Sequence, residues 1–191
     1  MCVERYDRKD SQRIHQEDFC QALGLRNVSK YQVQGFYNWY RDIISIADDL
    51  EIEIRHEILD FILFSYLIGN NDGHLKNLSL LYEPNGNISL APFYDLVCTE
   101  IYENIDNEMA IAFGSHYTKD DICYDDILIL AGDLQMDYTD IERRLEELIS
   151  ILPSTINKTR NESDDRQIVE KISKKIIENI VIAKDKLLYH S

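Results

Sequence analysis

Residues Leu67–Asn77 read LIGNNDGHLKN and decide the fold of this chain. The stretch follows one apolar run and precedes another, Leu78–Tyr82. Glycine often ends a helix, so the helical pattern before it predicts a helix that ends near Gly69. Asn-Asp-Gly is a strong turn signal. The sequence therefore predicts a helix, then a polar loop that carries Asp72, then a strand.

The polar residues around this loop occur in an order that suits phosphoryl transfer from ATP. Asp72 and Asn77 are five positions apart with His74 between them, and Asp95 follows 18 positions after Asn77. In this chemistry the first carboxylate accepts the proton of the acceptor hydroxyl, and the amide and the second carboxylate bind Mg²⁺. Mg²⁺ prefers oxygen ligands, and Asn and Asp supply them without adding much negative charge beside a polyphosphate.

A predicted β-hairpin connects the two halves of this polar set. Leu78–Tyr82 and Ile88–Ala91 are apolar, and the turn Glu83–Asn87 between them contains Asn-Gly, the strongest short hairpin signal. Because a hairpin returns the chain, we expect Asp95 to lie near Asn77. Without this convergence the Asp-x-x-x-x-Asn spacing would be weak, since polar residues gather in turns for backbone reasons alone.

These motifs resemble a known family. Ile68–Ser79 and Pro92–Leu96 are similar to the C-terminal kinase domain of HipA-type serine/threonine kinases, the toxin components of bacterial toxin–antitoxin pairs. Val3–Arg8 resembles the strand that leads from the hinge between the kinase lobes. His15–Gly24, followed by Lys30-Tyr31, resembles the next family block. The resemblance runs from about residue 3 to about residue 100 and is looser through the helical C-terminus.

By position, the resemblance implies that Asp72 is the catalytic base and that Asn77 and Asp95 bind Mg²⁺. It also implies that ATP contacts the hinge backbone and the loop. Gln16 is expected near the nucleotide, although its spacing from the hinge varies in the family. For His74 and Lys76, a structural or solvated role in the loop is the alternative. The implied nucleotide-binding residues are Glu4, Arg5, Tyr6, His74, Leu75, Lys76, Asn77, Tyr94 and Asp95.

The expected fold class is mainly α with a small β-hairpin, that of a protein-kinase-like C-terminal lobe. We expect one domain over residues 1–191, with a hinge-derived strand at 1–8, a catalytic core at 9–114 and a helical part at 115–191. Thr139–Glu142 fits a capping box, and the polar Pro153–Asp165 stretch predicts a surface linker. Apolar periodicity predicts helices at about 14–23, 36–47, 52–68, 120–131, 137–152 and 164–188.

The glycine pattern lacks a phosphate-binding loop. Neither Gly-x-Gly-x-x-Gly nor Gly-x-x-x-x-Gly-Lys can be drawn through the seven glycines. Because Met1–Glu4 matches the hinge, the resemblance implies that the N-terminal lobe, with its phosphate-covering loop and lysine, is missing. We therefore expect little or no kinase activity from the isolated chain, and activity only with an N-terminal lobe that is supplied by another chain or has been lost by truncation.

The formal net charge is −15, and the acidic excess is uneven. Between Asp95 and Ser150 the chain has 15 acidic residues against three basic ones, a balance of −12. This balance argues against direct nucleic-acid binding, which needs a basic surface. The acidic segment is either a solvated face or a surface that attracts a basic protein, such as a substrate or an antitoxin.

The sequence also suggests a compartment. No secretory signal follows Met1, and the longest apolar run, Ile58–Gly69, is interrupted by Asp60 and too short to span a bilayer. The four cysteines form no Cys-x-x-Cys pair, so we expect reduced thiols in a cytoplasmic protein without a zinc site or a membrane partner.

Three function classes remain open. The first is the C-terminal lobe of a HipA-like kinase that uses ATP and Mg²⁺. The resemblance implies that its substrates are proteins, including aminoacyl-tRNA synthetases, and that a DNA-binding antitoxin neutralises it. The second class is a non-catalytic remnant that binds a partner or binds Mg²⁺–nucleotide weakly. The third is a phosphoinositide-kinase-like enzyme, whose catalytic loop also reads Asp-x-His-x-x-Asn, although this chain has no basic patch for a lipid headgroup.

Overall fold

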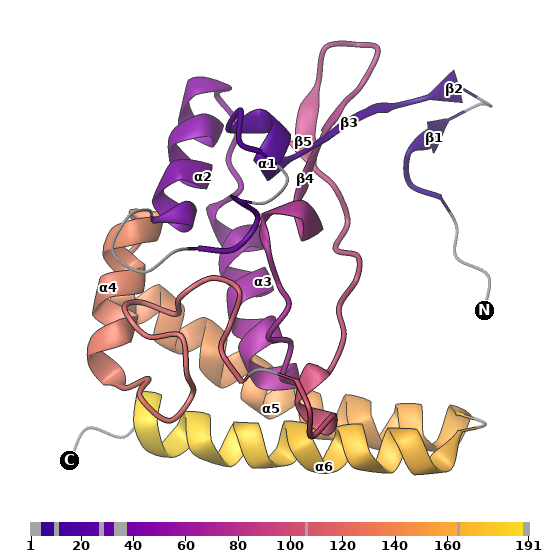
Figure 1. Cartoon of the computed structure of the whole chain (residues 1–191), viewed down its shortest axis with the longest axis vertical. Helices are drawn as coiled ribbons and strands as arrows, with labels where there is room; N and C mark the ends of the chain where they lie inside the picture. Colours follow the sequence, from indigo (N-terminus) through magenta and orange to yellow (C-terminus); the bar gives the residue numbers. More distant parts are fainter. Residues whose placement is uncertain are drawn as a thin grey trace.

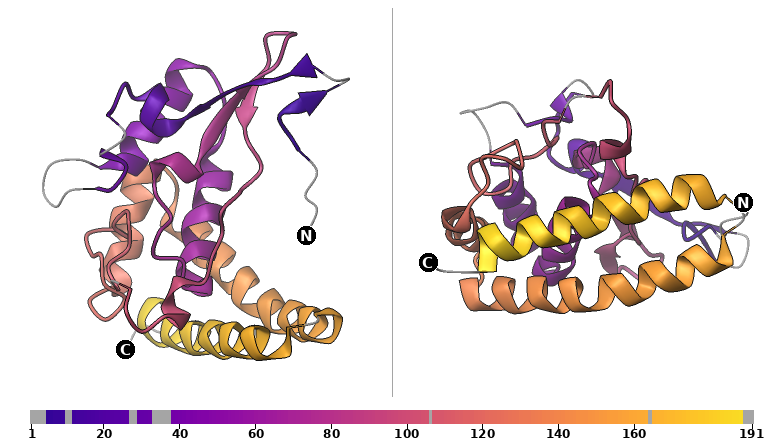
Figure 2. Two further views of the ribbon diagram at one scale, coloured as in Figure 1. Left: turned by 45° about the vertical axis from the view of Figure 1, so that its right-hand side comes forward. Right: turned by 90° about the horizontal axis from the view of Figure 1, so that it is seen from below.

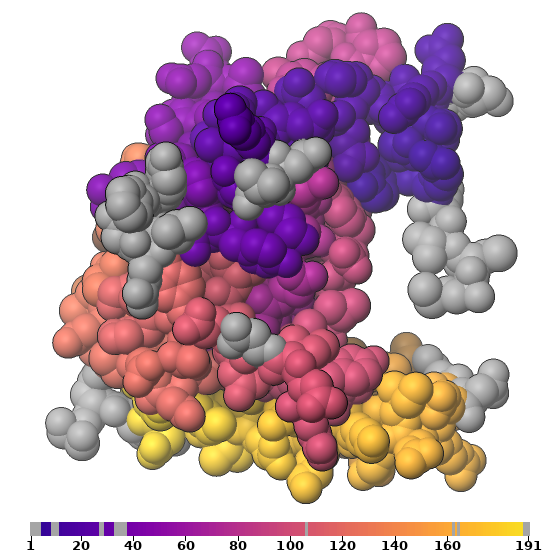
Figure 3. Space-filling model, in the orientation of Figure 1, coloured from indigo at the N-terminus to yellow at the C-terminus, as the bar shows by residue number. Residues whose placement is uncertain are grey.

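The computed structural model describes residues 5–9, 12–26, 29–32, 38–105, 107–163 and 165–188. Helix α3 (Arg55–Ile68) stands at the centre, with a small antiparallel sheet at one end and two long helices across the other (Figure 1). The segment between Asp95 and helix α4 (Tyr124–Leu134) covers the lower part of the front face, above the long helices (Figures 1 and 3). The C-terminal end of α3 lies against the long helices, where Asn179 Nδ2 donates to the Leu67 carbonyl at 3.2 Å, and the loop that follows runs back toward the sheet.

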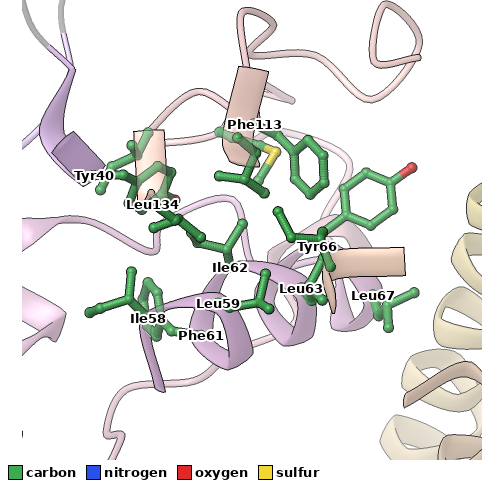
Figure 4. Close-up of a cluster of buried hydrophobic side chains, with 14 of the residues drawn as sticks. Tyr40, Ile58, Leu59, Phe61, Ile62, Leu63, Tyr66, Leu67, Phe113 and Leu134 are labelled. Atoms are coloured by element: carbon green, nitrogen blue, oxygen red, sulfur yellow. The ribbon is translucent and has the colours of Figure 1, made fainter. Parts of the chain in front are cut away.

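Helix α3 confirms the prediction of a helix that leads into the polar loop. Nine of its residues are buried, because apolar side chains occupy nearly all sides of the helix. Gly69 ends it in the left-handed conformation at φ 75°, which costs little for glycine. Figure 4 shows the apolar side chains of α3 among those of neighbouring elements, with the rings of Tyr66 and Phe113 5.2 Å apart. The helix begins at Arg55, three residues later than predicted.

The predicted hairpin is confirmed, and it belongs to a sheet of three strands. The strands β3 (His15–Asp18), β4 (Ser79–Tyr82) and β5 (Ile88–Leu90) are antiparallel in the order β3-β4-β5. In the register, Asp18 lies opposite Ser79, and Leu80 lies opposite Leu90.

The prediction of a helix from residue 14 was wrong for its first half. Residues 15–18 pair with β4 instead, which satisfies their backbone groups through a partner strand more than 60 positions away. Asp18 then caps the short helix α1 (Phe19–Ala22), accepting a hydrogen bond from the Gln21 N–H at 2.9 Å. The predicted stop at Gly24 agrees with its φ of 64°.

The strand expected over residues 3–8 is also corrected. The structure has a strand β1 at Arg8–Lys9, paired with β2 at Gln12–Arg13, and places residues 6 and 7 in a turn. The Arg5 guanidinium donates two hydrogen bonds to the Asp7 carboxylate, at 2.8 and 2.7 Å, which favours this turn over an extended chain. Val3 and Glu4 lie outside the described residues.

The remaining helices follow the predicted order with shifted bounds. Helix α2 (Trp39–Asp49) is capped by Asn38, and residues 33–37, where we placed its start, lie outside the description. Helix α5 (Tyr138–Glu162) and helix α6 (Arg166–Ala183) run side by side, as Figure 2 shows from below. A π-helical turn, Lys184–Leu188, continues α6, and two short 3₁₀ turns, Leu75–Asn77 and Thr99–Ile101, lie near the polar loop.

The linker predicted over Pro153–Asp165 was wrong, because α5 continues through Pro153 to Glu162. Proline lacks the N–H that would donate to the Ile149 carbonyl, so the helix continues with one hydrogen bond fewer. Next to it, the Ser154 and Thr155 hydroxyls donate to the Ile151 carbonyl at 2.8 and 3.3 Å. Burial of Ile156 against the core favours continuation of the helix.

The capping box predicted at Thr139–Glu142 was also wrong. Asp137 is the N-cap of α5, and its side chain makes no cap hydrogen bond. Its backbone carbonyl accepts the Asp140 N–H at 3.0 Å instead. Across the described parts of the chain, no helix is both long and apolar enough to cross a membrane.

Candidate functional site

Hydrogen bonds of its backbone groups hold the loop after α3 in place. The Asn70 N–H donates to the Ser65 carbonyl at 2.9 Å, and the Asn71 N–H donates to the Thr99 hydroxyl at the same distance. The Thr99 N–H in turn donates to the Gly69 carbonyl at 2.8 Å. These bonds join the end of α3 to the segment that follows Asp95, so they hold the loop in a defined conformation.

Asn77 and Asp95 meet as the hairpin prediction requires. The Asn77 Nδ2 donates to Asp95 Oδ2 at 3.2 Å, and Asn77 Oδ1 accepts the His74 N–H at 2.9 Å. Asn77 is 3% exposed, whereas Asp95 is exposed and adopts a left-handed φ of 57°. Asp tolerates that conformation better than most residues. The amide is therefore a fixed part of the loop, and the carboxylate stands beside it at the surface.

Asp72 is half-buried and has a hydrogen-bond partner that the sequence reasoning missed. The Tyr31 hydroxyl donates to Asp72 Oδ1 at 2.9 Å. Beside it, Lys30 Nζ lies 2.8 Å from His74 Nε2 and 4.6 Å from the centre of the Tyr31 ring. The motif Lys30-Tyr31 contributed to the family resemblance, but nothing in its spacing showed that the fold brings it to Asp72, 41 positions later.

The protonation states of His74 and Lys30 follow from their burial and from the charged groups near them. Burial and the adjacent Lys30 ammonium lower the pKa of His74, so its imidazole is neutral at pH 7. The pKa of Lys30 is raised, chiefly by its hydrogen bond to Tyr31 and also by the charges of Asp72 and Asp95. The Lys30 ammonium therefore stays protonated at neutral pH, near the carboxylates of Asp72 and Asp95.

A chain of hydrogen bonds ties Tyr94 to the loop. Gln16 Nε2 donates to Ser79 Oγ at 2.9 Å, and Ser79 Oγ lies 2.6 Å from the Tyr94 hydroxyl, which donates to the Lys76 carbonyl at 2.5 Å. The Tyr6 and Tyr94 rings stack with centroids 6.2 Å apart. Burial raises the pKa of Tyr94, so its hydroxyl stays protonated and can donate. The sequence reasoning placed Ser79 in the family motif and in the first strand of the hairpin, but gave it no role at the site.

The other residues that we expected at the nucleotide lie in different environments, and not all of them are free to contact a ligand with their side chains. Arg5 is engaged with Asp7 in the turn before β1, and Glu4 lies outside the described residues. Leu75 has no exposed side chain and belongs to the core, so it could meet a ligand only through its backbone. Lys76 is half-buried at the edge of the loop.

The oxygen atoms of Asn77 and Asp95 could supply part of the ligand shell of a hard cation, with the remaining ligands coming from another molecule. Both residues offer oxygen atoms, as Mg²⁺ prefers, but they supply only one carboxylate. Over the ranges that the structure describes, no group of three or more His, Cys, Asp and Glu side chains could hold a metal ion. The pair therefore suits Mg²⁺ that is bound mainly through nucleotide phosphates, and not a metal site built from protein alone.

A cavity of about 580 Å³ borders Asp72. Its lining joins Tyr31, Gln32, Asn71 and Asp72 with residues between Thr99 and Tyr117. Asp72, which the family resemblance implies to be the base, is thus part of the lining of a cavity.

Comparisons with known proteins agree on one family. Residues 1–181 match the family model of the HipA-like C-terminal domain. The protein Y4mE of Sinorhizobium fredii is 31% identical over 176 residues, which are 88% of this chain and 41% of that protein. The serine/threonine-protein kinase toxin HipA of Shewanella oneidensis is 30% identical over 142 residues, which are 64% of this chain and 32% of the toxin.

A solved structure agrees on the fold. The Shewanella oneidensis MR-1 toxin–antitoxin complex of HipA, HipB and operator DNA contains a chain that matches with a TM-score of 0.76 and 22% identity. The match covers 97% of this chain and 48% of that chain. It confirms the predicted fold class, a mainly helical protein-kinase-like lobe with a small antiparallel element. The present chain spans less than half the length of each of these relatives.

Proposed function

This chain belongs to the HipA-like C-terminal domain family, and from that membership we propose that it carries the acceptor and metal half of a serine/threonine protein kinase site. The observation that carries the proposal is the contact at 3.2 Å between Asn77, on the loop that presents Asp72, and Asp95, which follows β5. The order of the three groups suits ATP-dependent phosphoryl transfer. Family membership also favours this proposal over a phosphoinositide-kinase-like enzyme.

Asp72 is the proposed catalytic base. It would orient the acceptor hydroxyl and take its proton while the hydroxyl oxygen forms a bond to the γ-phosphorus and the bond to the ADP oxygen breaks. The Tyr31 hydroxyl occupies Oδ1 of Asp72, which leaves Oδ2 for the acceptor. Tyr31 is thus a positioning residue, because it fixes the orientation of the base.

Asn77 and Asp95 are the residues proposed to hold Mg²⁺. When bound with ATP, Mg²⁺ would neutralise the charge that develops on the phosphates. His74, Lys76, Tyr94 and the hinge residues Arg5 and Tyr6 are proposed to border the nucleotide. The bonds from Gln16 through Ser79 to Tyr94 support this assignment, since they hold the Lys76 carbonyl and the start of β4 in place.

The remaining phosphate contacts are proposed to come from outside these 191 residues. No glycine-rich phosphate loop can be drawn through the glycines of this chain, and its relatives are more than twice as long. A kinase site needs such a loop, or an equivalent clamp, to position the γ-phosphate. We therefore propose that a complementary segment completes the site, and that the complete protein acts on a protein substrate in the cytoplasm.

An antitoxin is the second proposed partner. The solved complex of HipA with HipB and operator DNA contains a chain of the same fold. In the present chain the acidic excess between Asp95 and Ser150 disfavours direct DNA contact, so DNA would be reached through the antitoxin.

The proposed metal role predicts a Mg²⁺-dependent effect of Asp95→Asn. We expect this variant to bind ATP at least about tenfold more weakly than the wild type in the presence of Mg²⁺, because the lost carboxylate is the charged ligand of the pair. Asn also tolerates the left-handed φ of this position, so the loop conformation should survive. Isothermal titration with and without Mg²⁺ measures the difference.

The matched control is Asp49→Asn, which removes the same charge from an exposed position at the end of α2. It should bind ATP like the wild type. In the absence of Mg²⁺ all three proteins should bind ATP with similar, weak affinity. Equal Mg²⁺-dependent affinity of Asp95→Asn and the wild type would contradict the assignment.

A further inference from the structure

An ion pair between Glu100 and Lys119 lies beside the end of α3. Lys119 Nζ is 2.6 Å from Glu100 Oε1, and the two side chains are only 12% and 11% exposed. Glu100 belongs to the 3₁₀ turn Thr99–Ile101, which lies against α6 (Figure 1). Lys119 lies in the segment that leads to α4. The pair therefore joins two segments that are about 20 positions apart, at a place that water scarcely reaches.

The carboxylate of Glu100 connects α6 to the end of α3. Asn179 Nδ2, from α6, donates to Glu100 Oε2 at 3.0 Å and to the Leu67 carbonyl at 3.2 Å. A Cβ atom on Gly69 would lie 2.8 Å from Glu100 Oε2, so the carboxylate packs directly against the residue that ends α3. A shift of Glu100 would therefore disturb the point at which the helix gives way to the polar loop.

The turn that contains Glu100 also holds the polar loop. The Thr99 hydroxyl donates to the Gly69 carbonyl at 3.0 Å and accepts the Asn71 N–H at 2.9 Å. The Glu100 N–H donates to the Gly69 carbonyl at 3.3 Å. Asp72 is the next residue after Asn71, so the position of its backbone depends on the position of this turn.

A buried ion pair acts mainly on the relative position of the segments that it joins. Removing two charges from water costs free energy that their attraction often only repays, so apolar side chains of similar size can replace such pairs without loss of stability. The pair nevertheless favours one arrangement, because a charge that moves away from its partner stays buried and unpaired. The Lys119 ammonium adds a contact to α3, since it lies 4.9 Å from the centre of the Tyr66 ring.

We propose that the ion pair of Glu100 and Lys119 holds residues 69–72 in place and thereby positions Asp72 for the reaction. The two are positioning residues, because neither lines the cavity that borders Asp72 and both act through the turn and the end of α3. The effect on the reaction rests on the proposed kinase function. The holding of the loop does not, since it follows from contacts within the chain.

The double variant Glu100→Leu, Lys119→Met tests this inference by amide hydrogen exchange of the full chain. Because apolar side chains replace the whole pair, the thermal midpoint should stay within about 5 °C of the wild type. The amides of Asn71 and Thr99, which bond across the loop, should exchange at least about tenfold faster. Unchanged exchange of these amides would overturn the proposal. A lower midpoint with faster exchange throughout the chain would show a role in stability alone and would also overturn it.

The matched control is Arg41→Met, Asp133→Leu, which removes an ion pair between α2 and α4 whose Nη2 and Oδ1 atoms are 3.0 Å apart. It should leave the exchange of Asn71 and Thr99 within about twofold of the wild type. Glu100→Gln is a second variant, which keeps the size of the side chain and removes its charge. It should speed both amides at least about threefold. If the control speeds these amides as much as the Glu100 variants do, the proposal is wrong.

Phosphoryl transfer separates this inference from the proposed function. With the chain co-expressed with an N-terminal kinase segment from a relative, the Glu100→Leu, Lys119→Met variant should lower kcat about tenfold to hundredfold. The KM for Mg²⁺–ATP should stay within about twofold, because a misplaced base slows the chemical step and leaves the nucleotide contacts in place. An unchanged kcat would overturn the positioning of Asp72. If the wild type itself transfers no phosphate, the proposed function fails, and the exchange rates alone decide whether the pair holds the loop.

Discussion

Replacing Asp72 with asparagine is expected to lower phosphoryl transfer about 10³-fold and to leave the affinity for Mg²⁺–ATP within about twofold of the wild type, because a positioned general base contributes about 10²- to 10⁴-fold to such reactions. The amide oxygen of asparagine can still accept the Tyr31 hydroxyl, which now bonds to Asp72 Oδ1 at 2.9 Å. The substitution should therefore remove proton transfer and keep the loop conformation.

This experiment needs a complete site. The chain would be co-expressed with an N-terminal kinase segment from one of its relatives, and transfer of the γ-phosphoryl group to protein would be followed with labelled ATP. Asp49→Asn, at the exposed end of α2, provides the matched loss of charge and should transfer like the wild type. Wild-type rates from Asp72→Asn in the active preparation would show that another group takes the proton.

The second large effect concerns stability and comes from Asp126, a fully buried carboxylate in the first turn of α4. Its Oδ1 accepts the Ser115 N–H at 2.8 Å and the Ser115 hydroxyl at 2.9 Å. Its Oδ2 accepts the Cys123 N–H at 2.9 Å and lies 2.9 Å from His116 Nδ1. Asp126 thus fixes both ends of the loop that leads from the cavity wall into α4.

We expect Asp126→Ala to lower the free energy of unfolding by about 3–5 kcal/mol, because it leaves buried donors without an acceptor and removes an anion from a helix N-terminus. Urea denaturation followed by circular dichroism measures this loss. The matched control is Asp125→Ala, at the adjacent and exposed position of the same helical turn, which should change stability by less than about 1 kcal/mol. A loss of that small size for Asp126→Ala would contradict the account.

The same carboxylate predicts a pH dependence. Burial alone would raise the pKa of Asp126, but the hydrogen bonds from Ser115, Cys123 and His116 outweigh it and lower the pKa below the usual value. A group with a lowered folded-state pKa contributes stability above its unfolded pKa, about 3.9, and that contribution is lost as the pH falls through the folded pKa. The difference between the wild type and Asp126→Ala should therefore narrow as the pH is lowered below about 4.

Local signals in the sequence were sufficient for the centre of the fold. The apolar run before Gly69 predicted α3, and Asn85-Gly86 predicted the hairpin, because both depend on residues close together in the chain. The hairpin in turn was enough to predict that Asp95 meets Asn77.

Tertiary contacts explain what the sequence could not predict. Residues 15–18 form a strand only because β4 is available to pair with them, and α5 passes Pro153 where Ile156 packs against the core. The hydrogen bond from Tyr31 to Asp72, and the closeness of Lys30 to His74, likewise depend on a fold that joins segments more than 40 positions apart. No motif in a single sequence records such a contact.

The most direct test of the central claim is a map of Mg²⁺–ATP binding on the ¹⁵N-labelled chain by nuclear magnetic resonance. If Asp72, Asn77 and Asp95 form a phosphoryl-transfer site, the amide shifts that change with Mg²⁺–ATP should concentrate in residues 72–79 and 93–96, and ATP without Mg²⁺ should cause smaller changes there. Shifts confined to other parts of the chain, or none in these two segments at millimolar Mg²⁺–ATP, would contradict the account.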